Sequence, residues 1–231
     1  MKKVDWEKIW EKHLEKYRAS EPHVGRFVYV NLKGIQSSLE LGCGSARDSY
    51  FLATKGIRAT ASDYAEENIR RLSETLRHDN LVLRTEDAFS LQAADDSFDL
   101  VFHDGLFIYF HDDGEIRKLV HEQVRVSRKY VLIVVHNALN HRLMEEYAEK
   151  SKSDPLFDIR FFTPQEIMQL VESCDINPRR IAVRKVMGGR LKRVYRYLSE
   201  KGIRGLFDSP VSPDWLQKWN RTERIACLVE L

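Results

Sequence analysis

The sequence has few cysteines and no long apolar run. Only Cys43, Cys174 and Cys227 are cysteines, an odd number, far apart and without a Cys-x-x-Cys pair. Neither a disulfide framework nor a zinc site is therefore expected, and we interpret all three as reduced thiols. No stretch approaches the roughly 20 apolar residues of a membrane span, and the first residues lack the apolar core of a signal peptide. We expect a cytoplasmic protein without membrane contacts.

An excess of charge of one sign is also lacking. The chain has 37 Lys and Arg against 35 Asp and Glu, a formal net charge of +2, which gives no argument for a nucleic-acid partner. The histidines form no His-Glu-x-x-His pattern, and His103-Asp104 with His111-Asp112 make only a loose cluster. No metal site is predicted. With 231 residues and 43% hydrophobic content, the chain can bury the core of one domain.

Helical and extended patterns alternate along the chain. Apolar residues at helical spacing predict an amphipathic helix over 4–18, whereas Glu21-Pro22-His23 breaks the pattern and 24–33 gives no firm assignment. Thr163, Pro164 and Glu166 have the order of a helix start. The predicted strands are 35–41, 57–62, 81–84, 98–102, 130–135, 181–186 and 225–231, and the further helices are 48–55, 65–77, 116–126 and 163–174.

This alternation predicts an α/β fold. We expect a doubly wound, Rossmann-like, seven-stranded and mostly parallel sheet with helices on both faces and an insertion between the last two strands. The expected divisions of this single domain are an N-terminal helical cap (1–34), a cofactor-binding core (35–187), a candidate substrate lid (188–223) and the last strand (224–231).

The segment 188–223 is too long for a simple connection between strands. One interpretation is a solvated helix that packs on the sheet through Leu191, Tyr195 and Leu198. The other is a lid whose arginines recognise an acidic group of the substrate. Its basic and Trp residues are Arg190, Lys192, Arg193, Arg196, Lys201, Arg204, Trp215 and Trp219.

A glycine turn between the first strand and the next helix carries the functional argument. Gly42 and Gly44 permit close approach of a ligand to the backbone, and Glu40 stands two places before the first of them. Asp63, at the end of the second predicted strand, can accept hydrogen bonds from ribose hydroxyls. Dinucleotide enzymes use a similar turn, but the third glycine of their pattern is missing here.

With this Glu-x-Gly-x-Gly pattern and Asp63, residues 35–140 resemble class I S-adenosylmethionine-dependent methyltransferases of the small-molecule, methyltransferase type 11-like kind. The resemblance implies that Glu40 to Ala46 surround the methionine part of S-adenosylmethionine and that Asp63 holds its ribose. Tyr64 would lie beside the adenine, and Asp87 would bind its amino group. Ala46 replaces the usual third small residue of the motif. The expected cofactor-binding residues are Tyr17, Arg18, Glu40, Gly42, Cys43, Gly44, Asp63, Tyr64, Asp87, Ala88, Phe89 and His103.

Methyl transfer from a sulfonium is an in-line displacement that positioning alone can accelerate strongly, so the resemblance demands no fixed catalytic residue. If a base is used, His103 and His136 at predicted strand ends are the catalytic candidates. Asp104, Tyr109 and His111 would shape the acceptor pocket. We expect a small-molecule methyl acceptor rather than nucleic acid.

Two alternatives remain open from the sequence. One is a nicotinamide-dependent oxidoreductase, against which the missing third glycine speaks. The other is a non-catalytic S-adenosylmethionine-binding module that serves as a sensor or as a partner in a complex. The sequence leaves the acceptor and the oligomeric state open.

Overall fold

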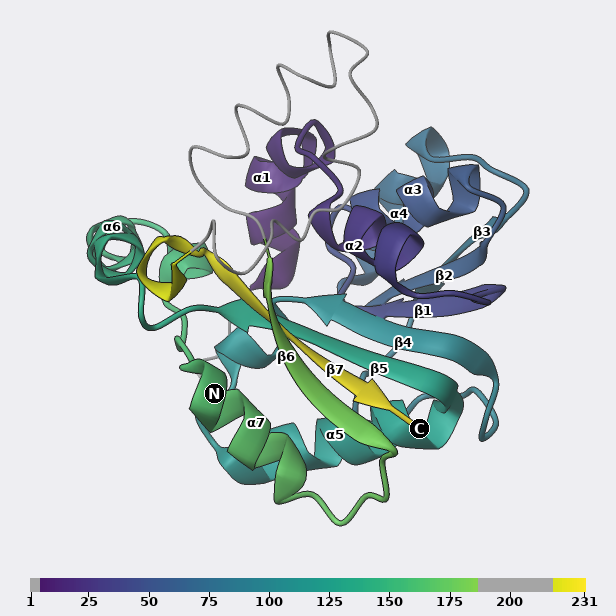
Figure 1. Cartoon of the computed structure of the whole chain (residues 1–231). Helices are drawn as coiled ribbons and strands as arrows, with labels where there is room; N and C mark the ends of the chain where they lie inside the picture. The colour runs from purple at the N-terminus through teal and green to yellow at the C-terminus, as the bar shows by residue number, and fades with distance from the viewer. Residues whose placement is uncertain (1–4, 187–217) are drawn as a thin grey trace, which may run out of the picture.

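The computed structural model describes residues 5–186 and 218–231. Its centre is a seven-stranded sheet of order β3-β2-β1-β4-β5-β7-β6 (Figure 1). The strands are β1 (Ser37–Leu41), β2 (Arg58–Asp63), β3 (Leu81–Thr85), β4 (Phe98–Asp104), β5 (Ser127–His136), β6 (Arg180–Val186) and β7 (Arg224–Glu230). Pairings from β3 to β5 are parallel, whereas β7 runs antiparallel to both β5 and β6. The mostly parallel seven-stranded sheet of the sequence prediction is confirmed.

Helices cover both faces of this sheet (Figure 1). The helices are α1 (Trp6–Arg18), α2 (His23–Asn31), α3 (Arg47–Thr54), α4 (Glu66–Thr75), α5 (Asp113–Val126), α6 (His141–Ser151) and α7 (Pro164–Glu172), with short 3₁₀ turns η1 (Phe107–Tyr109), η2 (Pro155–Phe157) and η3 (Trp219–Arg221). Figure 1 shows α2, α3 and α4 on one face and α5 and α7 on the other. The fold is therefore doubly wound, as predicted.

The buried strands separate two apolar layers. Phe102 and Leu132 of β4 and β5 pack with α2 and α3, while Val131 and Ile133 of β5 pack with α5 and α7. Each strand of this central part is apolar on both faces, because helices cover both. The strand order reverses between β1 and β4, and ligands of open α/β sheets bind beside such a switch point, at the carboxyl ends of the strands.

Most predicted elements are found within a few residues of their expected bounds. The capping box of α7 is formed, since the Thr163 side chain accepts from the Glu166 N–H and the Glu166 carboxylate accepts from the Thr163 N–H. Two helices, α2 and α6, were not predicted. The predicted insertion lies outside the described residues except for 218–223. No helix in the described part of the chain is long and apolar enough to cross a membrane.

Helix α1 lies over the carboxyl edge of the sheet and is fixed at two places. The Glu7 carboxylate accepts from the backbone N–H groups of Glu67 and Asn68, each at 3.1 Å, at the start of α4. Further along the helix, Asp154 before η2 accepts a hydrogen bond from Lys12 and lies 2.8 Å from His13 Nε2. The helix therefore bridges the two halves of the sheet.

Candidate active site

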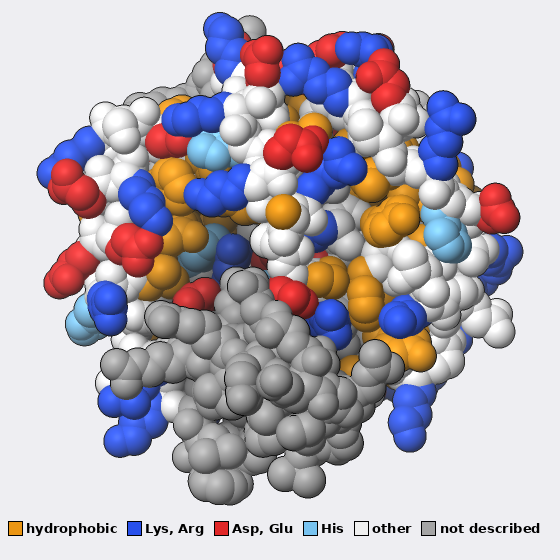
Figure 2. All heavy atoms as spheres, turned by 90° about the horizontal axis from the view of Figure 1, so that it is seen from above, with side chains coloured by type: hydrophobic (Ala, Val, Ile, Leu, Met, Phe, Trp, Pro, Cys, Tyr) orange, Lys and Arg blue, Asp and Glu red, His pale blue; other side chains and the backbone are white. Residues whose placement is uncertain are grey.

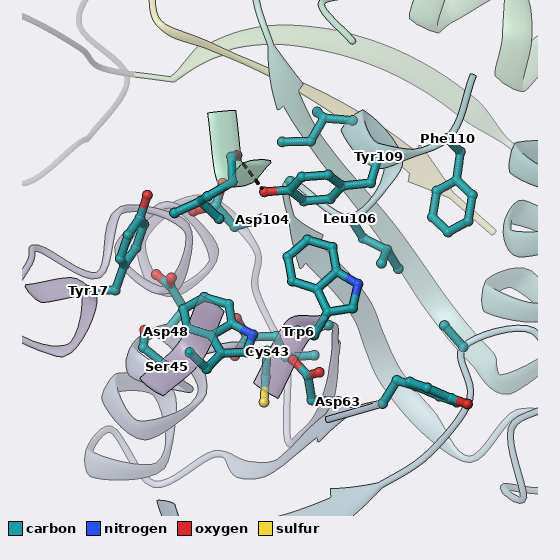
Figure 3. Close-up of a pocket in the computed structure, with 18 of the residues that line it drawn as sticks. Trp6, Tyr17, Cys43, Ser45, Asp48, Asp63, Asp104, Leu106, Tyr109 and Phe110 are labelled. Atoms are coloured by element: carbon teal, nitrogen blue, oxygen red, sulfur yellow. Dashed lines mark hydrogen bonds between the residues drawn. The ribbon is translucent and has the colours of Figure 1, made fainter. Parts of the chain in front are cut away.

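A cavity of about 490 Å³ lies beneath α1, at the carboxyl ends of β1, β2, β4 and β5 (Figure 3). One end is formed by the glycine turn after β1 and the loops after β2 and β3. The other is formed by the loop after β4, the end of β5, the start of β7 and residues of α6 and η2. The cavity thus spans the switch point of the sheet, where the topology places a ligand.

The glycine turn has the conformation that its sequence requires. Gly42 and Gly44 have φ of 58° and 52°, in the left-handed region that other residues rarely adopt. Asp63 holds this turn, because its Oδ2 accepts from the Gly44 N–H at 2.8 Å and its Oδ1 from the Ala65 N–H at 3.0 Å. Ala46, the departure from the family pattern, also has a positive φ of 51°.

Two acidic side chains are buried behind the turn. Glu40 Oε2 accepts from the backbone N–H and the hydroxyl of Ser49 at 3.0 and 2.6 Å. Burial, reinforced by the neighbouring charge of Asp48, raises the pKa of Glu40 to about 8. Asp48 Oδ1 accepts from the Gly25 N–H at 2.7 Å, and burial raises the pKa of Asp48 as well.

The loops after β2 and β3 form an open rim around the Asp63 end. Burial raises the pKa of Asp63, although its hydrogen bonds from Ala65 and Gly44 oppose this effect. Tyr64 is 73% exposed and Phe89 is 37% exposed. Asp87 Oδ1 accepts from the Phe89 N–H at 2.9 Å, which sets the turn of this loop.

A charged cluster occupies the other end. Asp104, at the end of β4, accepts from Arg47 Nη2 at 2.6 Å and from Arg224 Nη1 at 3.2 Å. Arg224 Nη1 also lies 3.2 Å from His136 Nδ1, and His136 Nε2 lies 3.2 Å from the Tyr147 hydroxyl. Burial opposes ionisation of Asp104, but the guanidinium groups of Arg224 and Arg47 outweigh it and lower the Asp104 pKa to about 2.

Aromatic side chains enclose the middle of the cavity. Trp6 packs edge-on against Tyr109, with ring centroids 4.6 Å apart, and Figure 3 shows this pair between Asp63 and Asp104. The Tyr109 hydroxyl donates to the Leu156 carbonyl at 3.1 Å. Tyr147 packs edge-on against Phe157 at 5.2 Å. The space between the glycine turn and the charged cluster is therefore largely apolar.

Most of the residues predicted from the sequence meet in this one cavity. Among the described lining residues are Tyr17, Glu40, Gly42, Cys43, Asp63, Tyr64, Asp87, Ala88, Phe89 and His136. Asp104 and Tyr109 also line it, whereas His111 is not among the described lining residues.

Three predicted residues are absent from the described lining. Gly44 lies beneath the Trp10 ring. The Arg18 guanidinium pairs with Glu15 at 3.0 Å. His103 is fully buried against Phe107, and burial lowers its pKa to about 3. The expectation that His103 faces the site is therefore corrected, because its strand-end side chain points into the core.

Several lining residues were not predicted. Arg47 and Asp48 directly follow the glycine turn, which is the signal that could have indicated them. Trp6 and Trp10 were expected only as the apolar face of a covering helix. Tyr147 lies on helix α6, which was not predicted, and Arg224, the first residue of the predicted last segment 224–231, was not expected in the site. In the described ranges, no group of three or more His, Cys, Asp or Glu residues could hold a metal ion.

Comparisons with known proteins bear on the fold and the cofactor. Residues 39–130 match a family model described as a methyltransferase domain. A search of curated protein sequences found no match. Many solved structures are similar, and at 12–15% identity the likeness of those named below concerns the fold.

A methyltransferase of Thermotoga maritima, described as S-adenosylmethionine-dependent and as a possible histamine N-methyltransferase, has a TM-score of 0.63 at 15% identity over 96% of this chain and 95% of that chain. An S-adenosylmethionine-dependent methyltransferase of Archaeoglobus fulgidus has a TM-score of 0.60 at 15% identity. The match covers 97% of this chain and 94% of that chain. Magnesium protoporphyrin IX methyltransferase of Synechocystis PCC 6803, solved with bound S-adenosylhomocysteine, has a TM-score of 0.56 at 12% identity. The match covers 97% of this chain and 85% of that chain. The matched domain over residues 39–130, the sheet order and these similar structures support the class I S-adenosylmethionine-dependent methyltransferase fold for this chain.

Proposed function

We propose that this enzyme transfers the methyl group of S-adenosylmethionine to a small molecule bound in the cavity beneath α1. The observation that carries the proposal is the single cavity of about 490 Å³, which joins the glycine turn to a separate charged and aromatic end. Small-molecule sites commonly have volumes of about 300–1,000 Å³. The cofactor would occupy the first end and the acceptor the second.

The residues at the first end fit the cofactor. The positive φ angles of Gly42 and Gly44 leave the backbone of the turn accessible to a ligand on the Gly42 side, which lines the cavity. We propose that Asp63 holds the ribose, that Tyr64 and Phe89 lie beside the adenine, and that Asp87 binds its amino group. The buried Glu40 would face the positively charged methionine part.

A small acceptor is supported by the way α1 closes the cavity. Its contacts with α4 and with Asp154 hold Trp6 and Trp10 in the lining of the cavity, where a large acceptor would have to displace them. On the face seen in Figure 2, the described Lys and Arg side chains are interspersed with Asp and Glu. Nucleic-acid sites instead gather positive charge on one face.

Bound S-adenosylmethionine supplies an electrophilic methyl group on a sulfonium sulfur. The contribution of the chain is to align the acceptor with this methyl group and to exclude water, and alignment alone can supply effective molarities of about 10⁵ M or more. His103 is withdrawn as a candidate base because it does not line the cavity. His136 does line it, but burial, followed by the nearby Arg224, lowers its pKa well below the ordinary value. We therefore assign no proton transfer to either histidine.

The assignment of Asp63 is tested by calorimetric titration of Asp63→Ala and Asp63→Asn with S-adenosylhomocysteine. Loss of the ribose contact would weaken binding by about tenfold or more. The alanine variant would also unfold at a lower temperature, because the Gly44 and Ala65 N–H groups lose their acceptor. Glu66→Gln, on the exposed surface of α4, is the control. Unchanged affinity in both Asp63 variants would refute the ribose assignment.

Turnover is tested separately by incubating the enzyme with methyl-labelled S-adenosylmethionine and pools of small metabolites. The proposal predicts label transfer to a compound of low molecular mass. Label recovered only in protein or RNA would contradict the small-molecule assignment.

A further inference from the structure

Of the two arginines in the described cavity lining, Arg224 has N–H groups that make no hydrogen bond to a described residue. Arg47 donates from all three of its nitrogen atoms, to Asp48, Ser20 and Asp104. Arg224 donates only from Nη1, and its Nε and Nη2 have no partner among the described residues. The side chain is 24% exposed, and Arg224 belongs to the lining of this cavity. One edge of this guanidinium is thus available to a ligand.

The neighbouring histidine fixes the direction of the hydrogen bonds. A guanidinium has donors and no acceptor, so His136 Nδ1, 3.2 Å from Arg224 Nη1, must accept. His136 is neutral, and its one proton therefore lies on Nε2, which donates to the Tyr147 hydroxyl oxygen at 3.2 Å. The Tyr147 O–H is then directed elsewhere and serves as a donor. This end of the cavity therefore offers two sets of donors beside the ionised Asp104, whose charge is already shared by Arg47 and Arg224.

The donors are set in an apolar surrounding. Tyr147 packs against Phe157 and Phe161 at 5.2 and 5.7 Å, and Ile108 and Leu156 line the same cavity. The Nε and Nη2 edge of a guanidinium matches the two oxygens of a carboxylate, and hydrogen bonds of this kind are strengthened by the charges. A site with such donors and apolar walls selects an oxyanion on a small apolar body.

We propose that the methyl acceptor is a small carboxylic acid whose carboxylate binds Arg224 and Tyr147; this deepens the proposed function and rests on it. The position of Arg224 favours the acceptor over the carboxylate of the cofactor's methionine part. Arg224 begins β7, on the far side of β5, whereas the glycine turn and Asp63 follow β1 and β2. The inferred subsite therefore lies on the β5 and β7 side of the cavity, and the segment after the glycine turn reaches Arg224 only through Arg47 and Asp104.

The test measures binding of benzoate, butyrate and their neutral amides to enzyme saturated with S-adenosylhomocysteine. At least one carboxylate is expected to bind about tenfold more tightly than its amide, because the charge-assisted contacts need an anion. Arg224→Met should abolish this preference and Tyr147→Phe should reduce it. Arg180→Met, on an exposed position of β6, is the matched control. Tyr147→Phe keeps the ring, so it remains informative if Arg224→Met fails to fold.

Two sets of outcomes would overturn the inference. The first is that no carboxylate binds, or that the preference survives both substitutions. The second is that Arg224→Met weakens S-adenosylhomocysteine but not 5′-methylthioadenosine, which lacks the amino-acid part; this would assign Arg224 to the cofactor. Failure of the wild-type protein to bind S-adenosylhomocysteine would instead refute the proposed function, so the two failures are distinguishable.

Discussion

The indole ring of Trp10 lies directly on the backbone of Gly44, so that a Cβ at position 44 would overlap the ring. A helix at the start of the chain is thereby in contact with the turn that carries the cofactor motif. Because Glu7 and His13 fix the same helix at two other places, the position of Trp10 depends on the seating of α1 as a whole. Cofactor binding and the seating of α1 should therefore be coupled.

Gly44→Ala should weaken cofactor binding by displacing Trp10. The substitution also costs about 1–2 kcal/mol of stability, because φ at this position is 52°. Calorimetry with S-adenosylhomocysteine and thermal unfolding measure the two effects. In the double variant Gly44→Ala/Trp10→Ala the overlap is relieved while the backbone strain remains. If the double variant binds no better than Gly44→Ala alone, the contact between the ring and the turn does not limit binding.

Glu7→Gln should loosen α1 without changing the cofactor pocket itself. The Glu7 carboxylate caps the free N–H groups of α4, and a negative charge at a helix N-terminus contributes about 0.3–1 kcal/mol. Stopped-flow recording of tryptophan fluorescence, to which the cavity-lining Trp6 and Trp10 contribute beside Trp215 and Trp219, should show faster release of S-adenosylhomocysteine. Glu11→Gln is the matched control, because Glu11 lies on the same helix and, within the described residues, forms an ion pair only with Arg71, at 3.8 Å. Equal release rates in the two variants would show that the seating of α1 on α4 does not limit cofactor release.

The sequence predicted the sheet and several residues that line the glycine-turn end of the cavity because their signals are local. The glycine turn, Asp63 at a strand end and the Thr163 capping box each need only neighbouring residues to be recognised. The charged end of the cavity depends on contacts between distant segments, such as Arg224 with Asp104 and His136. No periodicity in the sequence reports such contacts. His103 was misplaced for the same reason, since a strand-end position does not determine which face its side chain takes.

Glu40 should make the free enzyme less stable as the pH rises. Burial raises its pKa from 4.5 to about 8, so the folded state binds the proton more tightly than the unfolded state. The contribution of Glu40 to the free energy of unfolding is fully present below pH 4.5 and is lost as the pH rises through about 8. Between these two pH values the free energy of unfolding falls by on the order of 1 kcal/mol per pH unit. Glu40→Gln does not titrate, so its stability relative to wild type should increase over this range.

Chemical unfolding at several pH values measures the effect of Glu40. The variant Glu66→Gln controls for the loss of an exposed carboxylate. A constant difference between wild type and Glu40→Gln from pH 5 to 8 would show that Glu40 is ionised throughout.

Asp104 should make the protein less stable as the pH falls, the opposite of the effect of Glu40. Substitutions at Asp104 also test whether the charged cluster acts as a unit. The pKa of Asp104 lies below the ordinary 3.8 because Arg224 and Arg47 outweigh the burial that opposes ionisation. Its contribution to the free energy of unfolding is therefore present above pH 3.8 and is lost as the pH falls toward 2.

Asp104→Asn should destabilise the protein by about 3 kcal/mol at neutral pH, since it leaves Arg47 and Arg224 without their shared partner. Adding Arg47→Met to Asp104→Asn should cost less than Arg47→Met costs alone, by about 1 kcal/mol. Strictly additive losses in this double-mutant cycle would mean that the 2.6 Å contact between Arg47 and Asp104 contributes no coupling energy.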